Sequence, residues 1–118
     1  MKVLVCGGRR YRDWDQLRGV LDILSAEMQI TEVIHGDAQG ADRLAGVWAR
    51  LAGIPERRFP ADWARYSLDA GPMRNAQMLV MGKPDLVVAF PGNGGTRDMV
   101  ERAAKAGLRI ILVPETVT

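Results

Sequence analysis

Short apolar runs alternate with amphipathic stretches along this chain, and this alternation limits the available folds more than any other feature. The apolar runs predict five strands, at 2–6, 32–36, 56–61, 85–90 and 109–113. Apolar residues at helical spacing predict four helices, at 14–28, 41–53, 72–81 and 96–107. Such alternation is typical of a parallel sheet with helices on both faces. We therefore expect an α/β fold, a Rossmann-like three-layer sandwich whose mostly parallel sheet has the strand order 3-2-1-4-5.

The ends of these helices carry their own signals. Asp13 is the expected N-cap of the first helix, with Gln16 three residues later. Gly53 is expected to end the second helix, because glycine readily adopts the left-handed conformation found there. Pro72 is expected at the first position of the third helix, where a missing N–H costs little. The span 62–71 has no clear period and is predicted to be the longest loop.

Length and composition indicate one domain. The chain has 118 residues, 47% of them hydrophobic, which suits a single core, so we expect one domain over 1–118. The longest apolar runs span about five residues, far short of the ~20 that a membrane helix needs. The N-terminal MKVLVCGG reaches glycine too early for a signal peptide. Cys6 is the only cysteine, which fits a reducing compartment. These features predict a cytoplasmic protein without a membrane segment.

The charges are nearly balanced. Sixteen basic residues stand against 14 acidic ones, and arginine outnumbers lysine by 13 to 3. Arginine suits bidentate contacts to phosphate or carboxylate, although a GC-rich genome would produce the same bias. Single-stranded nucleic acid calls for a basic groove with stacking aromatic residues, and only 6% of this chain is aromatic. Nucleic acid is therefore not the expected partner.

Three glycine-containing loops follow predicted strands: CGGRRYRD at 6–13, HGDAQGAD at 35–42 and PGNGGT at 91–96. In a parallel sheet these loops share the edge where ligands bind. Glycine lets backbone N–H groups approach a ligand, and the following helix directs its free N–H groups to the same place. The candidate ligand-binding residues are Gly7, Gly8, Arg9, Gly36, Gly40, Pro91, Gly92, Asn93, Gly94, Gly95 and Thr96. The alternative is that the glycines only make compact turns.

Four motifs in combination resemble a known family. PGNGGT resembles the PGGxGT signature of the SLOG superfamily, which joins the Smf/DprA and Lonely Guy proteins. GGRRY, HGDAQGAD, FPADW with AGPMRN, and AFPGNGGTRDMV resemble its YspA/cpYpsA-related branch over nearly the whole chain. The resemblance implies a Rossmann-like fold and a nucleotide or nucleotide-derived ligand. Lonely Guy proteins are phosphoribohydrolases, which cleave the N-glycosidic bond of a nucleoside monophosphate.

The site residues of that family carry over only in part. Its middle-helix arginine matches Arg74, and its phosphate loop matches 91–96, with Asn93 in place of a glycine. Its active-site glutamate does not carry over, since Met99 stands at that position. Asp98 lies one residue earlier, which on a helix is a turn of ~100°, so it cannot simply replace the glutamate.

Arg74 is the main catalytic candidate, with Asp98 and Asp42 as further ones. Each carboxylate could equally have no catalytic role and only stabilise its helix by a favourable interaction with the helix dipole. If hydrolysis occurs, one of these carboxylates or Glu101 must orient water or stabilise an oxocarbenium-like transition state. No set of His, Cys and carboxylates has metal-ligand spacing, so no metal site is expected.

Several residues near these loops have two interpretations. Arg9, Arg10 and Arg12 could contact an anion or form a solvated face. Tyr11 or Trp63 could stack on a base, although packing is the preferred interpretation of both. His35 is expected to be structural, and Cys6 to act as a small apolar residue.

Three functions remain open. The first is a sensor or binding domain for a nucleotide or a nucleotide-derived small molecule. The second is an N-glycosidic hydrolase acting on a nucleoside monophosphate, and the third is single-stranded DNA binding. No cofactor is required, although Mg²⁺ could accompany phosphates. The methionine-rich helix at 72–81 could face the sheet or a partner in a homodimer.

Overall fold

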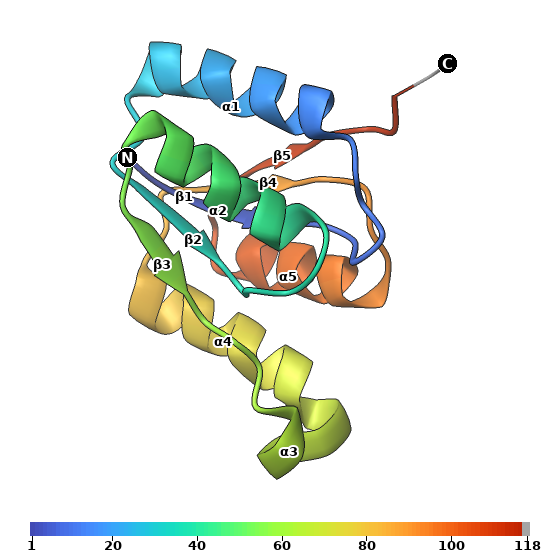
Figure 1. Cartoon of the computed structure of the whole chain (residues 1–118). Coiled ribbons are helices and arrows are strands. Elements are labelled where there is room, and N and C mark those ends of the chain that lie inside the picture. The colour runs from blue at the N-terminus through green and yellow to red at the C-terminus, as the bar shows by residue number, and fades with distance from the viewer. Residues whose placement is uncertain (117–118) are drawn as a thin grey trace.

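A five-stranded parallel sheet forms the centre of the computed structural model, which describes residues 1–116 (Figure 1). The strands are β1 (Lys2–Cys6), β2 (Glu32–His35), β3 (Glu56–Arg58), β4 (Leu86–Ala89) and β5 (Arg109–Leu112). Their order is β3-β2-β1-β4-β5, and every neighbouring pair is parallel. The sequence-based prediction of an α/β fold with this strand order is confirmed.

Helices cover both faces of the sheet. They are α1 (Trp14–Met28), α2 (Ala41–Ala52), α3 (Trp63–Tyr66), α4 (Ala70–Gly82) and α5 (Gly94–Lys105). Helices α1 and α2 lie on one side of the sheet, and α4 and α5 lie on the other (Figure 1). Along residues 1–116, no helix is long and apolar enough to cross a membrane.

The central strand β1 divides the core between these layers, because alternate side chains of a strand point to opposite faces. Val3 and Val5 are fully buried among the side chains of α1 and α2. Leu4 and Cys6 are buried with Met78 of α4 and other apolar residues on the opposite face. The carboxyl ends of β1 and β4 are adjacent, since Cys6 pairs with Ala89.

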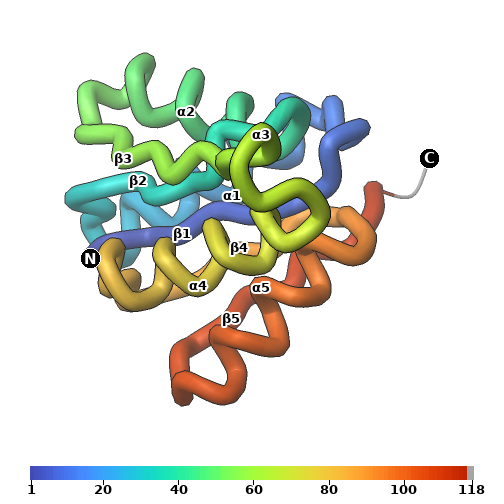
Figure 2. The backbone as a smooth tube through the Cα atoms, turned by 90° about the horizontal axis from the view of Figure 1, so that it is seen from below, coloured from blue at the N-terminus to red at the C-terminus, as the bar shows by residue number. Residues whose placement is uncertain are grey.

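The prediction of a long loop at 62–71 is wrong. Helix α3 and a 3-10 turn (Ser67–Asp69) occupy most of this span, and α4 begins at Ala70. Asp62 caps α3 by accepting a hydrogen bond from the Arg65 amide at 3.1 Å. Figure 2 shows α3 beside the N-terminal end of α4. A helix of one turn is too short to show a hydrophobic period, so the sequence pattern could not reveal it.

Other boundaries differ less. Pro72 is the third residue of α4, not the first. Helix α5 begins at Gly94, two residues before the expected start at Thr96. The expected caps are confirmed: the Asp13 side chain accepts a hydrogen bond from the Gln16 amide, and Gly53 adopts a left-handed conformation with φ of 71°.

Candidate functional site

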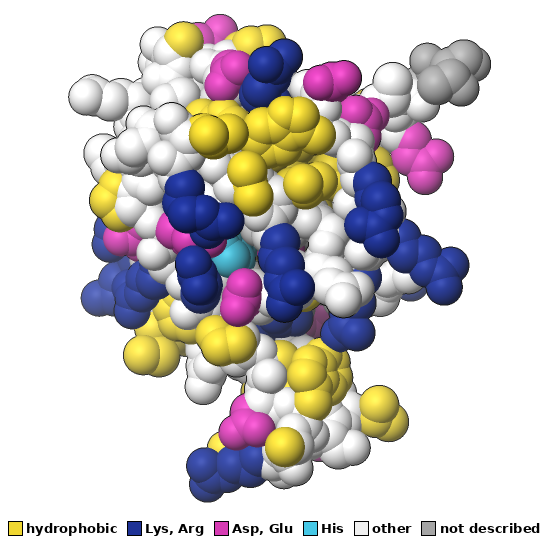
Figure 3. Space-filling model, in the orientation of Figure 1, with side chains coloured by type: hydrophobic (Ala, Val, Ile, Leu, Met, Phe, Trp, Pro, Cys, Tyr) yellow, Lys and Arg dark blue, Asp and Glu magenta, His cyan; other side chains and the backbone are white. Residues whose placement is uncertain are grey.

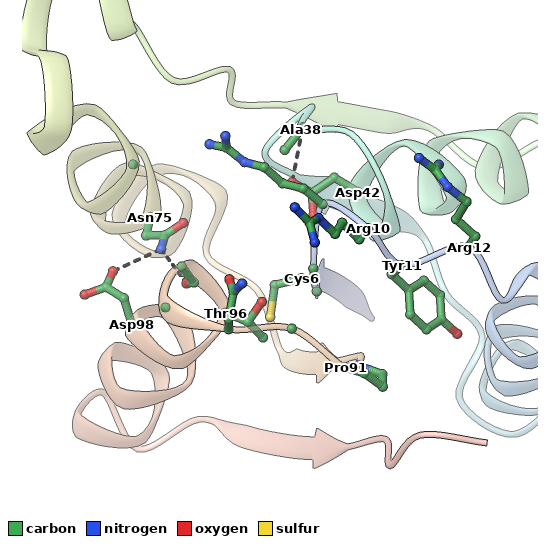
Figure 4. A pocket seen from close by; sticks show the side chains of 18 of the residues that line it. Cys6, Arg10, Tyr11, Arg12, Ala38, Asp42, Asn75, Pro91, Thr96 and Asp98 are labelled. Atoms are coloured by element: carbon green, nitrogen blue, oxygen red, sulfur yellow. Dashed lines mark hydrogen bonds between the residues drawn. The ribbon is translucent and has the colours of Figure 1, made fainter. Parts of the chain in front are cut away.

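A cavity of about 1130 Å³ opens at the carboxyl ends of β1 and β4 (Figure 4). Three segments line most of it: the first loop (7–13), the segment 91–96, and the first two turns of α4. Of the predicted site residues, those that line the cavity are Gly7, Gly8, Arg9, Asp42, Arg74, Pro91, Gly92, Asn93, Gly94, Gly95, Thr96 and Asp98. The fold therefore brings together residues as far apart in the chain as Gly7 and Asp98.

Glycines let the first loop and the segment 91–96 meet backbone to backbone. The amide of Gly8 donates a hydrogen bond to the carbonyl oxygen of Pro91 at 2.8 Å. A Cβ atom on Gly92 would lie 2.2 Å from Thr96 Oγ1 and 2.7 Å from the Gly8 nitrogen. No larger residue fits at Gly92 unless this backbone contact separates.

The N-terminus of α5 opens into the cavity. Asn93, its N-cap, makes no side-chain capping bond within the described residues, and the first helical bond runs from the Arg97 amide to Asn93 O at 2.9 Å. The amides of Gly94, Gly95 and Thr96 precede that bond, so they belong to the free donors of the first turn. Together with the positive end of the helix dipole they favour an anion here.

The second loop (36–40) differs, because the protein's own carboxylate occupies it. Asp42 Oδ2 accepts hydrogen bonds from the amides of Gly36 at 3.1 Å and Ala38 at 3.3 Å. The first amide of α2, that of Ala41, donates to Gly8 O at 3.2 Å. The described residues that line the cavity do not include Gly36 or Gly40. Against expectation, these two glycines pack the loops together and do not face the cavity.

Asp42 is the most buried acid of the site, with 6% of the residue exposed. Burial raises the pKa of its carboxyl, while the positive charge of Arg74 and the amides of Ala38 and Gly36 act in the opposite direction. Burial likewise raises the pKa of Cys6 to about 12, and Asp42 adds to that effect. The thiol is therefore protonated at neutral pH, which excludes it as an activated nucleophile.

Arg74 lies over the second loop. Its Nη1 donates to Gly36 O at 2.7 Å and its Nε donates to Asn75 Oδ1 at 3.0 Å. Burial lowers the pKa of Arg74, and Asp42 opposes this shift. A guanidinium has five N–H donors and stays charged, so donors remain for a ligand anion.

Asn75 connects Arg74 with α5, and sequence reasoning missed it. It is 4% exposed, and its Nδ2 donates to Gly95 O at 3.2 Å and to Asp98 Oδ2 at 3.0 Å (Figure 4). Both donor hydrogens and the acceptor oxygen of its amide are thus engaged. The only signal in the sequence was its place directly after Arg74 in PMRN.

Asp98 is already bound by the protein. Besides the bond from Asn75, its Oδ2 accepts one from Arg102 Nε at 2.8 Å, one turn later on α5. The side chain is 29% exposed and lines the cavity. Its main visible role is to fix the start of α5 against α4.

Arginines line the rim of the cavity. Arg9, Arg10 and Arg12 are exposed, and Lys and Arg side chains gather across the middle of the face drawn in Figure 3. Tyr11 between them turns into the core: its ring centroid lies 5.4 Å from that of Phe90, and its hydroxyl donates to Gln16 Oε1 at 2.6 Å. The packing interpretation of Tyr11 fits this environment, and Tyr11 has little ring surface left for a base.

His35 has a structural environment. It is fully buried, and its Nδ1 accepts a hydrogen bond from the Asp37 amide at 2.9 Å. Nε2 therefore carries the proton and donates to Glu56 Oε2 at 2.6 Å. Glu56 Oε1 accepts further bonds from Arg50 at 2.7 Å and Arg58 at 3.1 Å. This network joins the end of β2 to β3 and α2 beneath the second loop.

We expect this network to give the protein a defined acid sensitivity. Desolvation acts to raise the pKa of Glu56, but hydrogen bonds from Arg58, His35 and Arg50 outweigh it and lower the pKa to about 2. A lowered carboxyl pKa stabilises the fold above the ordinary value of 4.5, and this contribution is lost as the pH falls toward 2. Urea unfolding at pH 5 and pH 2.5 should show a loss about 2 kcal/mol larger for the native protein than for Glu56→Gln.

Other carboxylates titrate in both the native protein and Glu56→Gln. The difference between their losses of unfolding free energy therefore measures the contribution of Glu56. Equal losses of stability in the two proteins over this interval would contradict the assigned network.

The chain is similar to several known proteins. Residues 1–66 match the YAcAr family, described as the YspA, cpYpsA-related SLOG family. Gene 61 protein of Mycobacterium phage D29 is 36% identical over 121 residues, which cover 93% of this chain and 94% of the phage protein. The X-ray structure of DNA processing protein A (DprA) from Streptococcus pneumoniae superposes on 98% of this chain with a TM-score of 0.74 and 18% sequence identity. This chain spans 51% of that structure, and the likeness shows a shared fold. By the family match and the extent of the phage similarity, the chain belongs to the YspA, cpYpsA-related SLOG family.

Proposed function

We propose that the cavity binds a nucleotide or a nucleotide-derived small molecule, and that the protein serves as a sensor or binding domain. The observation that carries this proposal is the open first turn of α5, whose amides face the cavity next to Arg74. Membership of the SLOG family supports the ligand class. The proposal requires no cofactor.

The phosphate of such a ligand would accept hydrogen bonds from the amides of Gly94, Gly95 and Thr96. Arg74 would add a charge-assisted bond, since the protein's own acceptors hold its Nε and Nη1 and leave its other donors. Asn75 would fix the position of Arg74 relative to the first turn of α5, because its side chain bonds Arg74 on one side and the Gly95 carbonyl on the other. The phosphate would thus be bound by Arg74 of α4 and by the N-terminal amides of α5, and the Asn75 side chain would hold these two groups in place.

Calorimetric titration of the purified protein would test the proposal. We expect AMP and ribose 5-phosphate to bind, adenosine to bind more weakly than AMP, and EDTA to leave the affinities unchanged. Absence of binding of all three at millimolar concentration would refute the proposal. A further titration with an oligothymidylate tests for binding of single-stranded DNA. Such binding through the arginines at the rim of the cavity would weaken steeply with increasing salt.

An N-glycosidic hydrolase is the second candidate, and Asp42 is the observation that favours it. A buried carboxyl with a raised pKa, lining the same cavity as Arg74, has the character of a general acid. Such an acid would protonate the base as its N-glycosidic bond breaks, water would add to C1′ of the ribose, and the proton that this water loses would return to the Asp42 carboxylate. Release of free base from AMP, absent in Asp42→Asn, would establish this activity. Binding of AMP without release of base would leave the sensor function standing.

A further inference from the structure

One part of the cavity wall is aromatic. Trp63, the first residue of α3, lines the cavity and is 45% exposed. Its ring packs closely on α4, because a Cβ atom on Gly71 would lie 3.3 Å from Trp63 Cη2. A large planar side chain is therefore held by one edge while much of its surface stays accessible.

Arg9 covers this ring. Its Cζ lies 5.0 Å from the centroid of the Trp63 ring, a cation–π contact between the first loop and α3. Within residues 1–116, the Arg9 guanidinium makes neither a hydrogen bond to a side chain nor a salt bridge. The Arg9 backbone, in contrast, is fixed, because its neighbour Gly8 bonds Pro91 O at 2.8 Å. Arg9 is thus a long cation whose guanidinium contacts the Trp63 ring and whose backbone is anchored beside the segment 91–96.

Arg9 lines the same cavity as Arg74 and the first turn of α5, where the phosphate is proposed to bind. Burial is the main cause that lowers the pKa of Arg74, and the positive charge of Arg9 adds to it. Two guanidinium groups that repel each other at one cavity favour an anion between them. Arg9 therefore has two competing partners, the Trp63 ring and a ligand phosphate.

We infer that Trp63 is the stacking platform for the heterocyclic base of the ligand, and that Arg9 leaves its ring for the phosphate when a nucleotide binds. This inference rests on the proposed function and names the residues that recognise the two ends of the ligand. Stacking of a base on an aromatic ring generally contributes more binding free energy than an exposed cation–π contact. The exchange is favourable when the ligand carries both a base and a phosphate.

A nucleoside without a phosphate must displace Arg9 from the Trp63 ring and has no anionic group to bind the displaced guanidinium. Removing Arg9 should therefore have opposite effects on the two kinds of ligand. Affinity for adenosine should rise in Arg9→Ala by about 2- to 5-fold, the value of the lost cation–π contact. Affinity for AMP should fall by about 5-fold or more, because a charge-assisted bond to the phosphate is lost.

The experiment is calorimetric titration of AMP, adenosine and ribose 5-phosphate into the native protein, Trp63→Ala, Trp63→Phe and Arg9→Ala. Trp63→Ala should bind AMP about 10- to 100-fold more weakly while its affinity for ribose 5-phosphate is unchanged. Trp63→Phe, which keeps a smaller aromatic ring, should bind AMP with an affinity between those of the native protein and Trp63→Ala. AMP should quench the tryptophan fluorescence of the native protein and of Trp14→Phe, a control outside the cavity lining, and should not quench that of Trp63→Phe.

The outcomes separate this inference from the proposal on which it rests. If ribose 5-phosphate and AMP bind and Trp63→Ala leaves both affinities unchanged, the stacking platform is refuted and the phosphate site stands. If Trp63→Ala weakens both ligands equally, its role is structural and the inference is again refuted. If Arg9→Ala shifts adenosine and AMP in the same direction, the exchange is refuted. If the native protein binds none of the three ligands, the proposed function fails and this inference fails with it.

Discussion

Gly92→Ala is expected to bind ribose 5-phosphate and AMP at least about 100-fold more weakly than the native protein. The new Cβ atom would lie 2.2 Å from Thr96 Oγ1 and 2.7 Å from the Gly8 nitrogen. A rotation of Thr96 would relieve only the contact with Oγ1, because Thr96 Cβ would remain 2.9 Å away. The contact with the Gly8 nitrogen is with backbone and forces the first loop away from the segment 91–96. The amides of α5 and the first loop would then no longer face the same anion, and the loss of one or two charge-assisted hydrogen bonds accounts for this factor. Calorimetry with both ligands measures it.

Two further variants control this result. Gly94→Ala should keep the native fold and melting temperature, because its Cβ atom would meet no heavy atom of residues 1–116 within 4 Å. The double variant Gly92→Ala/Thr96→Ala should stay defective, since removing the hydroxyl leaves the contact with the Gly8 nitrogen. Native affinity in Gly92→Ala would show that the anion does not bind at this end of α5.

Gly40→Ala should cause the largest loss of stability, about 3 kcal/mol or more. Gly40 has φ of 84°, and a Cβ atom there would lie 2.2 Å from Gly8 O and 2.7 Å from the Arg9 carbonyl carbon. The substitution therefore combines an unfavourable backbone conformation with a collision against the backbone of the first loop. Urea unfolding followed by circular dichroism measures the change.

Gly53→Ala is the comparison variant, because Gly53 also has a positive φ but lies in the milder left-handed helical region, with ψ of 26° against −129° at Gly40, and has no collision within residues 1–116. Its φ is 71°, and in the described part of the chain its Cβ atom would have no neighbour within 4 Å. We expect it to cost only about 1 kcal/mol, the strain of a non-glycine residue with positive φ. Similar losses in Gly40→Ala and Gly53→Ala would contradict the close packing of the first and second loops.

The sheet could be predicted from the sequence because its signals are local and repeated. Each strand is an apolar run, and right-handed crossovers leave few ways to arrange five such strands. The N-cap at Asp13 and the stop at Gly53 could also be predicted, since each depends on one residue type at one position. The same reasoning placed the first loop and the segment 91–96 at one edge, where the cavity lies.

The rest depends on contacts between distant residues. Nothing in HGDAQGAD shows that Asp42 turns back to accept the amides of Gly36 and Ala38, although this decides whether the loop can take an outside anion. Asn75 likewise gains its role only when α4 packs on α5 and brings Asp98 within 3.0 Å. The single turn of α3, which carries Trp63, has a capping residue but no hydrophobic period. Side-chain partners of this kind follow from the fold and not from spacing.

The carboxylate in the second loop also sets how much charge a ligand can bring. Asp42 already binds the loop amides of Gly36 and Ala38, and the first amide of α2 is bound by Gly8 O, so the first turn of α5 supplies the free amides, which suits a compact monoanionic or dianionic group. Asp42 lines the cavity, so a relative with a small neutral residue at this position would open the cavity to the amides of Gly36 and Ala38 as a second set of donors. Its cavity would then favour a polyphosphate or a dinucleotide. The identity of this one side chain would therefore determine how much negative charge a bound ligand carries.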